Sequence, residues 1–384
     1  MLRRVKVFFL GVVVLTFWPP HGANAGFEIT HDNGVTQIDG SIFGAPFRMV
    51  RPDEWNGGLV LLLHGAVPEN APLTLPPVGH ELFDPLSAGF VAQGYGVAYS
   101  SYRVNGYAVR EGAFDTRVVE FLFSILMGRP SETYLAGVSM GTHIGQRLVE
   151  RSPYRYEGYL PVCAALGGST VQQDYFADAR VLFDYFYPGT LPGNLLTADL
   201  DYFTEVIPLV VGELMSNPDP LLLLDYAATL GYFWQSPDEL AEGAVAALAL
   251  AGGGTMDLQR KSGGNFYDNS GRVYSGSRDD ETLNGIIERF VADPRSVRYF
   301  RRYYDPNGRL PYTKVLHLHT TRDAIVPLHI HQPVYERLLQ RRGYERNYVV
   351  RTFDRFGHCN VGPNELFTGF ADLVQWVATD IRPQ

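Results

Sequence analysis

Ser139 lies in the pentapeptide GVSMG, where an apolar run that predicts a strand (TYLA) meets a run that predicts a helix (THIGQRLVERS). This spacing matches the G-x-S-x-G turn, in which a serine side chain is exposed at the end of a strand. Gly137 and Gly141 carry no side chains, so the strand and the helix can approach closely. The stretch therefore predicts a nucleophilic serine at position 139.

A serine hydroxyl is a weak nucleophile unless a base, usually a histidine oriented by a carboxylate, removes its proton. Around a turn of this kind the acid and then the histidine follow the serine along the chain, each just after a later strand. Asp323 follows the apolar run KVLHLH, and His358 lies in a glycine-marked turn after NYVVRTF. Two other acids are candidates. Asp354 is only four residues before His358 in the sequence and belongs to the strand run that precedes it, while Asp305 belongs to a DPNG turn. We expect Asp323 and His358 to form a catalytic triad with Ser139.

Attack on a carbonyl carbon also needs N–H donors for the oxyanion that develops. One donor is expected directly after the nucleophile, at Met140, where a helix begins. The second is expected after an earlier strand, and the stretch LVLLLHGA supplies such a turn. We expect the backbone N–H of Ala66 to be this donor, although His64-Gly65 is also what an ordinary strand-end turn looks like.

The stretches HLH and HIH contain His317, His319, His329 and His331 and suggest a metal site. Alternate residues of a strand face the same way, so each pair could chelate. However, neither an acid-rich nor a cysteine-rich cluster accompanies them. We therefore predict buried or hydrogen-bonded histidines that flank the loop carrying Asp323, which we call the acid loop. We expect neither a metal nor a cofactor.

Elements that could position these residues follow one another in a regular order. Residues 27–56 predict short strands joined by Gly and Asn turns, and the runs at 59–63 and 96–100 predict buried strands. Helical periodicity runs from Phe114 to Gly128 and again over 367–379. Strands that alternate with helices indicate an α/β fold, with a doubly wound and mostly parallel sheet.

One interval in this pattern is too long for a single crossover connection. Between a strand at Leu160 and a strand at Val315 the chain carries helical runs and many aromatic residues, so 167–312 is expected to be a helical cap or lid insertion. We expect 26–166 and 313–384 to form the catalytic domain. Most of the insertion's aromatic side chains should be its own core, while a few could line an apolar pocket.

The first 25 residues have the layout of a secretory signal peptide. MLRRVKVFFLGVVVLTFWPPHGANA has a basic start, an apolar run and a small-residue end. The apolar run is short for a membrane span, although an uncleaved anchor is the alternative. We expect an exported protein, periplasmic or secreted, with no stable membrane span after cleavage.

Composition and charge narrow the possible partners. Apolar residues make up 46% and charged residues 19% of the 384, as in globular proteins with a large core. Cleavage would remove three positive charges, so the formal charge would change from −9 to −12 (−9 − 3). A chain this acidic repels phosphate backbones, which excludes nucleic acid as an expected partner.

The motifs LLLHG, GVSMG, RDAIVP and FGHC resemble those of the α/β-hydrolase superfamily, over residues 57–65, 95–145, 156–166 and 314–379. The resemblance implies that Ser139 is the nucleophile, His358 the general acid and base, and Asp323 its orienting acid. Members mostly cleave esters, and some cleave amides or peptides. Their insertions between the sixth and seventh strands usually act as lids or caps, and the insertion here falls there.

The cysteine directly after His358 resembles the tannase and feruloyl esterase group, in which a disulfide ties the serine and histidine loops. This sequence departs from that pattern, because Val138 and Met140 flank Ser139 and the other cysteine, Cys163, follows the next strand. The resemblance implies a Cys163–Cys359 bridge at strand ends. An even number of cysteines in an exported chain is consistent with one.

Three function classes follow from these residues. The first is a carboxylic ester hydrolase acting through an acyl-enzyme on a small-molecule or polymer ester, with apolar or aromatic acyl groups favoured by the aromatic insertion. The second is an amidase or peptidase with the same triad, in which Glu205, Glu213 or Asp225 could hold a substrate amine. The third is a non-catalytic binding protein on the same scaffold. The sequence does not determine the oligomeric state.

Overall fold

A nine-stranded sheet is the centre of the computed structural model, which describes residues 26–249 and 252–383. The signal-peptide prediction for residues 1–25 lies outside the described part. The strand order is β1-β2-β3-β5-β4-β6-β7-β8-β9. β1 to β3 and the β3–β5 pair are antiparallel, and all later pairs are parallel. The strands are β1 Phe27–Asp32, β2 Val35–Ile42, β3 Ala45–Pro52, β4 Gly58–Leu63, β5 Gly96–Ser100, β6 Glu132–Val138, β7 Gly158–Val162, β8 Lys314–Arg322 and β9 Tyr348–Phe356.

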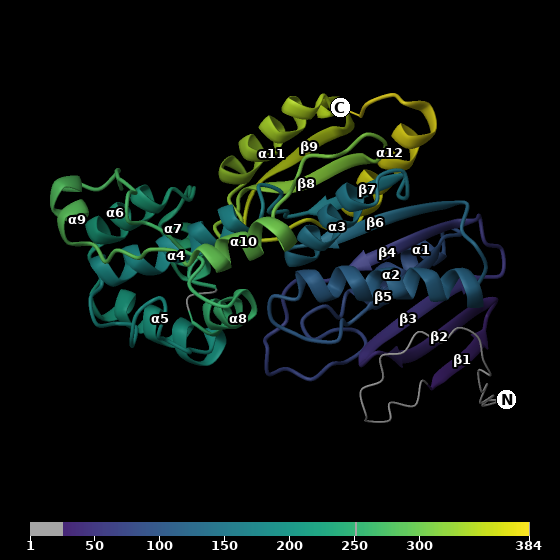
Figure 1. Ribbon diagram of the computed structural model, residues 1–384, viewed down its shortest axis with the longest axis horizontal. Coiled ribbons are helices and arrows are strands. Elements are labelled where there is room, and N and C mark those ends of the chain that lie inside the picture. Colours follow the sequence, from purple (N-terminus) through teal and green to yellow (C-terminus); the bar gives the residue numbers. More distant parts are fainter. Residues whose placement is uncertain (1–25, 250–251, 384) are drawn as a thin grey trace.

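Helices cover both faces of this sheet, as in a doubly wound fold (Figure 1). β4 shows why: Leu59, Leu61 and Leu63 belong to one hydrophobic core, while Val60 and Leu62 belong to the other. The first core includes side chains of α2 (Val109–Leu126), α3 (Met140–Arg151) and α11 (Leu328–Arg342). The second includes side chains of α1 (Phe83–Val91) and α12 (Pro363–Thr379). A short 3-10 helix, Glu345–Asn347, precedes β9. The α/β sheet predicted from the alternating pattern is therefore present.

The long interval between β7 and β8 folds as helices, which we call the cap. Figure 1 shows α4 to α9 gathered at one end of the sheet, with α10 returning toward α3. The cap elements are α4 Ser169–Phe186, a π-helix Tyr202–Val206, α5 Ile207–Ser216, α6 Pro220–Leu230, α7 Pro237–Ala247, α8 Gly253–Ser262, α9 Asp280–Ile286 and α10 Pro294–Tyr303. None of the described helices is long and apolar enough to cross a membrane.

Most aromatic side chains of the cap are buried in its own core. The buried ones include Tyr175, Phe176, Phe183, Phe186, Tyr187 and Tyr232. Phe203 and Phe233 are exceptions, being 62% and 51% exposed. Only a few aromatic rings of the cap are thus free to contact a ligand.

Candidate active site

Ser139 stands between the last residue of β6 and the first residue of α3, with φ 49° and ψ −126°. A positive φ is uncommon for a residue with a side chain and marks a strained, sharp turn. A Cβ atom on Gly141 would collide with the carbonyl oxygen of Leu63, and one on Gly137 would lie 3.0 Å from the oxygen of Gly141. The turn therefore needs glycine on both sides of Ser139.

Three side chains predicted from the sequence form one hydrogen-bonded row. His358 Nε2 lies 2.9 Å from Ser139 Oγ, and His358 Nδ1 lies 2.7 Å from Asp323 Oδ2. The Asp323 side chain is fully buried, whereas the imidazole of His358 is 17% exposed and Ser139 is half-buried. The row thus runs from a buried carboxylate to a serine that solvent can reach.

Asp323 is held in place as an acceptor. Its Oδ1 accepts hydrogen bonds from the backbone N–H groups of Ile325 and Val326, both at 2.9 Å. Burial disfavours the charged carboxylate, but the imidazoles of His358 and His319 outweigh burial and hold the pKa of Asp323 well below its usual range. Asp323 is therefore an anion that can orient the imidazole of His358.

The loop that carries His358 is tied to the end of the sheet. Cys163, just after β7, forms a disulfide with Cys359, with a Cα–Cα distance of 4.9 Å. The Thr320 hydroxyl donates to the carbonyl of Gly357 at 2.7 Å, and the amide of Gly357 donates to the carbonyl of Arg322 at 3.0 Å. These links join the loop to both β7 and β8.

The predicted oxyanion donors come from two segments that meet at Ser139. Met140 is the first residue of α3, so its N–H has no partner within the helix. Gly65 packs against Ser139, since a Cβ on Gly65 would lie 3.1 Å from Ser139 Cβ. Ala66 follows Gly65 and is exposed. The loop after β4 and the start of α3 therefore flank the serine.

Sequence reasoning missed His80, which lies beside this loop. A Cβ on Gly65 would lie 3.0 Å from His80 Cε1, and the His80 ring lies 5.4 Å from the His64 ring. Burial lowers the pKa of His80, against an opposing effect of the Ala66 carbonyl. His80 lies in a stretch without helical or strand periodicity, VGHEL, so no sequence signal assigned it to the site.

His64 itself is buried at the end of β4. Its Nδ1 lies 2.8 Å from the carbonyl oxygen of Gly65, and its ring stacks on Tyr102 with centroids 3.8 Å apart. Burial, followed by the nearby His80, lowers the pKa of His64 to about 3. We therefore regard His64 as a neutral side chain that supports the loop.

The competing acids lie elsewhere. Asp354 pairs with Arg322 and accepts from Thr321 at 3.0 Å, with its side chain 76% exposed. Asp305 accepts hydrogen bonds from the backbone and hydroxyl of Thr170 at the start of α4. The imidazole of His358 is hydrogen-bonded to Asp323 and not to either of these carboxylates, so the geometry favours Asp323.

The four histidines near the acid loop form two unlike pairs. His317 and His319 are adjacent on one face of β8, with Nε2 and Nδ1 2.8 Å apart. The expectation that HIH lies on a strand is wrong, because His329 and His331 lie in the first turn of α11 and point in different directions. The ring of His329 contacts the ring of Phe233 of the cap, and His331 Nε2 lies 2.7 Å from Gln172 Oε1 of α4. All four therefore contact side chains of the protein.

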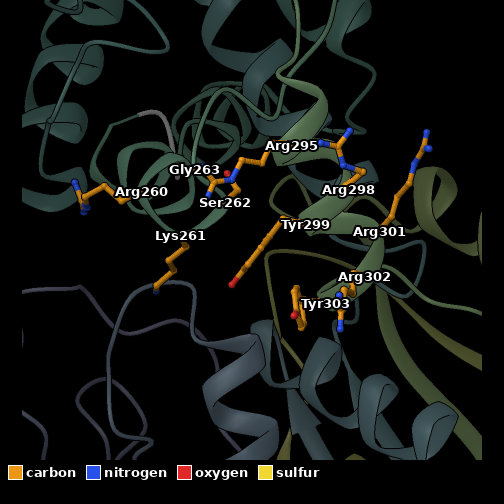
Figure 2. Close-up of a pocket in the computed structure, with 10 residues that line it drawn as sticks. All are labelled: Arg260, Lys261, Ser262, Gly263, Arg295, Arg298, Tyr299, Arg301, Arg302 and Tyr303. Carbon is orange, nitrogen blue, oxygen red and sulfur yellow. The ribbon is translucent and has the colours of Figure 1, made fainter.

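A cavity of about 670 Å³ lies apart from this row of residues, between α8 and α10 (Figure 2). Its lining contains six basic side chains, and Ser139, Asp323 and His358 are not part of it. Arg260 and Lys261 already pair with Glu69 and Asp257. Figure 2 shows Arg298 and Arg301 pointing away from Lys261, so the cations do not converge on one point.

Comparisons with known proteins give structural likeness at low sequence identity. No protein-family model matches the sequence, and no curated protein matches it. Feruloyl esterase B from Aspergillus oryzae is 14% identical, with a TM-score of 0.46 over 95% of this chain and 83% of that chain. An esterase from Pyrococcus furiosus is 12% identical, with a TM-score of 0.44 over 94% and 95%. A thermostable carboxyl esterase from Bacillus coagulans is 13% identical, with a TM-score of 0.43 over 90% and 98%.

The chain's own architecture identifies the fold. A mixed sheet with antiparallel strands at its N-terminal edge is followed by parallel strands with helices on both faces. The serine turn follows β6, and Asp323 and His358 follow β8 and β9 in the expected chain order. On this order of strands and turns, the chain has the α/β-hydrolase fold.

Proposed function

We propose that this protein is a serine hydrolase that cleaves carboxylic esters through an acyl-enzyme. The observation that carries the proposal is the unbroken row Ser139–His358–Asp323, with distances of 2.9 and 2.7 Å, in a turn that exposes the serine. These are the contacts that a serine needs in order to lose its proton during attack.

In the proposed reaction Ser139 Oγ bonds to the carbonyl carbon of the ester while its proton passes to His358 Nε2. The carbonyl oxygen becomes an anion, which the N–H groups of Met140 and Ala66 would stabilise. The intermediate collapses as the C–O bond breaks, and His358 protonates the departing alcohol. Water, deprotonated by His358, then releases the acid and restores Ser139. Asp323 orients the ring and stabilises its charged form.

Contacts within the cap favour an ester over a peptide substrate. A peptidase that holds a substrate amine would need a free carboxylate in the cap. Asp225 pairs with Arg278 at 2.8 Å, and Glu205 accepts from the amide of Asp201 at 2.8 Å. Glu213 accepts from the side chain of Asn217 at 3.3 Å. Because all three carboxylates have partners within the cap, the amidase or peptidase is the second candidate.

We assign the cap, residues 167–312, the role of covering the site formed by 26–166 and 313–384. Glu239 of α7 accepts from Arg322 at 3.0 Å, directly before Asp323. The exposed Phe233 contacts the ring of His329 in a tilted arrangement, with ring centroids 4.3 Å apart. An exposed aromatic ring beside the acid loop supports an apolar or aromatic acyl group. The disulfide and the signal-like residues 1–25 support export.

The test is hydrolysis of p-nitrophenyl esters from acetate to long acyl chains, beside the matching anilides. Ser139→Ala should lower ester turnover by at least about three orders of magnitude, because the variant has no nucleophile. Circular dichroism should show an unchanged fold. The chain length with the highest kcat/KM would measure the size of the acyl pocket.

Other outcomes would select another function class. Anilide turnover comparable to ester turnover would indicate an amidase or peptidase. Ester turnover that persists in the Ser139→Ala variant would contradict the assignment of the nucleophile. Absence of turnover together with no covalent labelling by a fluorophosphonate would leave a binding protein on this scaffold.

A further inference from the structure

A second imidazole contacts the acid loop from inside the protein. His319 is fully buried on β8, and its Nε2 lies 3.5 Å from Asp323 Oδ2 and 2.9 Å from the carbonyl oxygen of Val326. Its other nitrogen, Nδ1, lies 2.8 Å from His317 Nε2. The mechanism proposed above gives His319 no role, although it contacts the same carboxylate oxygen as His358.

Hydrogen-bond partners determine where the protons of this cluster must be. The backbone N–H of Ala164 donates to His317 Nε2 at 3.2 Å, so this nitrogen acts as an acceptor. His317 then carries its proton on Nδ1 and donates to the Tyr348 hydroxyl at 2.9 Å. Because His317 Nε2 has no proton to give, His319 Nδ1 must be the donor in the contact between the two rings.

The other nitrogen of His319 faces only acceptors. A backbone carbonyl oxygen and an ionised carboxylate oxygen cannot donate, so Nε2 must also carry a proton. The alternative, a proton on His317 Nε2, would leave the buried amide of Ala164 facing another N–H. Native structures rarely leave a buried backbone donor without an acceptor.

We propose that His319 is a permanently protonated imidazolium, and that it acts as a positioning residue which holds Asp323 as an anion. Asp323 and His319 would form a buried pair with no net charge, so Asp323 stays ionised even while His358 is neutral. A second positive charge near Asp323 also opposes protonation of His358. The cation would therefore extend the activity of the enzyme to lower pH.

Among the residues that the structure describes, none in direct contact with His319 supplies another positive charge. Burial lowers the pKa of His317 and of His331 on α11 well below the usual range, which makes both rings neutral. Tyr348 of β9 contacts His317, and Tyr175 of the cap donates to the carbonyl of Ala324 at 2.7 Å. Among the buried histidines of this cluster, His319 is the one that contacts a carboxylate, so the charge belongs on its ring.

Neutron diffraction from crystals of the perdeuterated, unmodified protein at neutral pH tests the protonation directly. The expected result is nuclear density for deuterium on both Nδ1 and Nε2 of His319, and on Nδ1 but not Nε2 of His317. Density on a single nitrogen of His319 would overturn the proposal. This measurement requires neither a variant nor an active enzyme, so it is independent of the proposed function.

The effect on catalysis rests on the proposed function and is tested by the pH profile of kcat/KM for the best ester. His319→Gln should move the acid limb upward by about one pH unit, because the opposing charge is gone. His31→Gln is the matched control, since His31 lies on the exposed strand β1 and contacts Thr36. A loss of kcat with an unmoved acid limb would show that His319 has only a structural role and would contradict the proposal.

Discussion

The choice between Asp323 and Asp354 depends on where each carboxylate lies. Asp354 is close to His358 in the sequence, but Asp323 is the carboxylate that is buried and lies 2.7 Å from His358 Nδ1. Asp354 is exposed and pairs with Arg322. An exposed ion pair contributes little, whereas a buried carboxylate that orients a base is needed in every turnover.

Asp323→Asn should therefore lower kcat of the proposed ester hydrolysis by about 10⁴-fold, because the amide stabilises the wrong tautomer of His358 and cannot offset its charge. Asp354→Asn, the matched control, should leave kcat within about twofold. Steady-state kinetics on one p-nitrophenyl ester measures both variants. Equal losses in the two variants would contradict the assignment of Asp323.

The strands determine which loops meet. β7, β8 and β9 are parallel neighbours, so Cys163, Asp323 and His358 all follow carboxyl ends at the same edge of the sheet. The serine turn follows β6, the next strand across. The disulfide closes a loop of 196 residues that contains the whole cap. It therefore constrains both the cap and the turn that carries His358.

The double variant Cys163→Ser/Cys359→Ser should lose up to about 5 kcal/mol of unfolding free energy, because a long loop is no longer closed in the unfolded chain. We also expect kcat to fall by up to about 100-fold, since the His358 turn is held less firmly. Urea denaturation and ester kinetics measure the two effects. Circular dichroism at the assay temperature should confirm that the variant is folded. Full kcat with free thiols would show that the bridge does not position His358.

The cap meets the part of the molecule that carries Ser139, Asp323 and His358 at a buried carboxylate, Glu150. Glu150 of α3 accepts hydrogen bonds from the amides of Asn307 and Gly308, at 2.6 and 3.1 Å, where the chain returns from α10 to β8. Burial raises the pKa of Glu150 to about 7, against the effect of these amides. The join between the two parts of the molecule should therefore depend on pH.

The sign of this dependence follows from linkage. The folded state holds the Glu150 proton more tightly than the unfolded state does, so its contribution to stability is fully present below pH 4.5 and is lost as the pH rises through about 7. Between pH 5 and pH 8 the unfolding free energy of the wild type should fall by as much as about 3 kcal/mol on account of this group.

Glu150→Gln does not titrate, so its unfolding free energy should fall less steeply over the same pH range. Urea denaturation at several pH values, with wild type and variant in parallel, measures the difference in slope. The exposed Glu281→Gln on α9 is the control and should keep the wild-type slope. Identical slopes for wild type and Glu150→Gln would contradict the prediction.

The sequence by itself determined the serine turn, the fold class and the order of the candidate site residues along the chain. GVSMG predicts a sharp turn because Gly137 and Gly141 have no side chains that would keep the strand and the helix apart, and alternating apolar strands and helices predict the layered sheet. Chain order then indicated Asp323 and His358. These features can be predicted because they depend on residues that are neighbours in the sequence and on the order in which strands and helices follow one another along the chain.

Only the tertiary structure decided which groups meet. HIH on α11 resembles a strand pattern when read alone, and its helix forms because it packs on the sheet and on α4. The position of His80 beside Gly65, the burial of Glu150 and the contact between His319 and Asp323 are seen only in the folded chain. Periodicity cannot encode such contacts, because each depends on where several distant segments pack together.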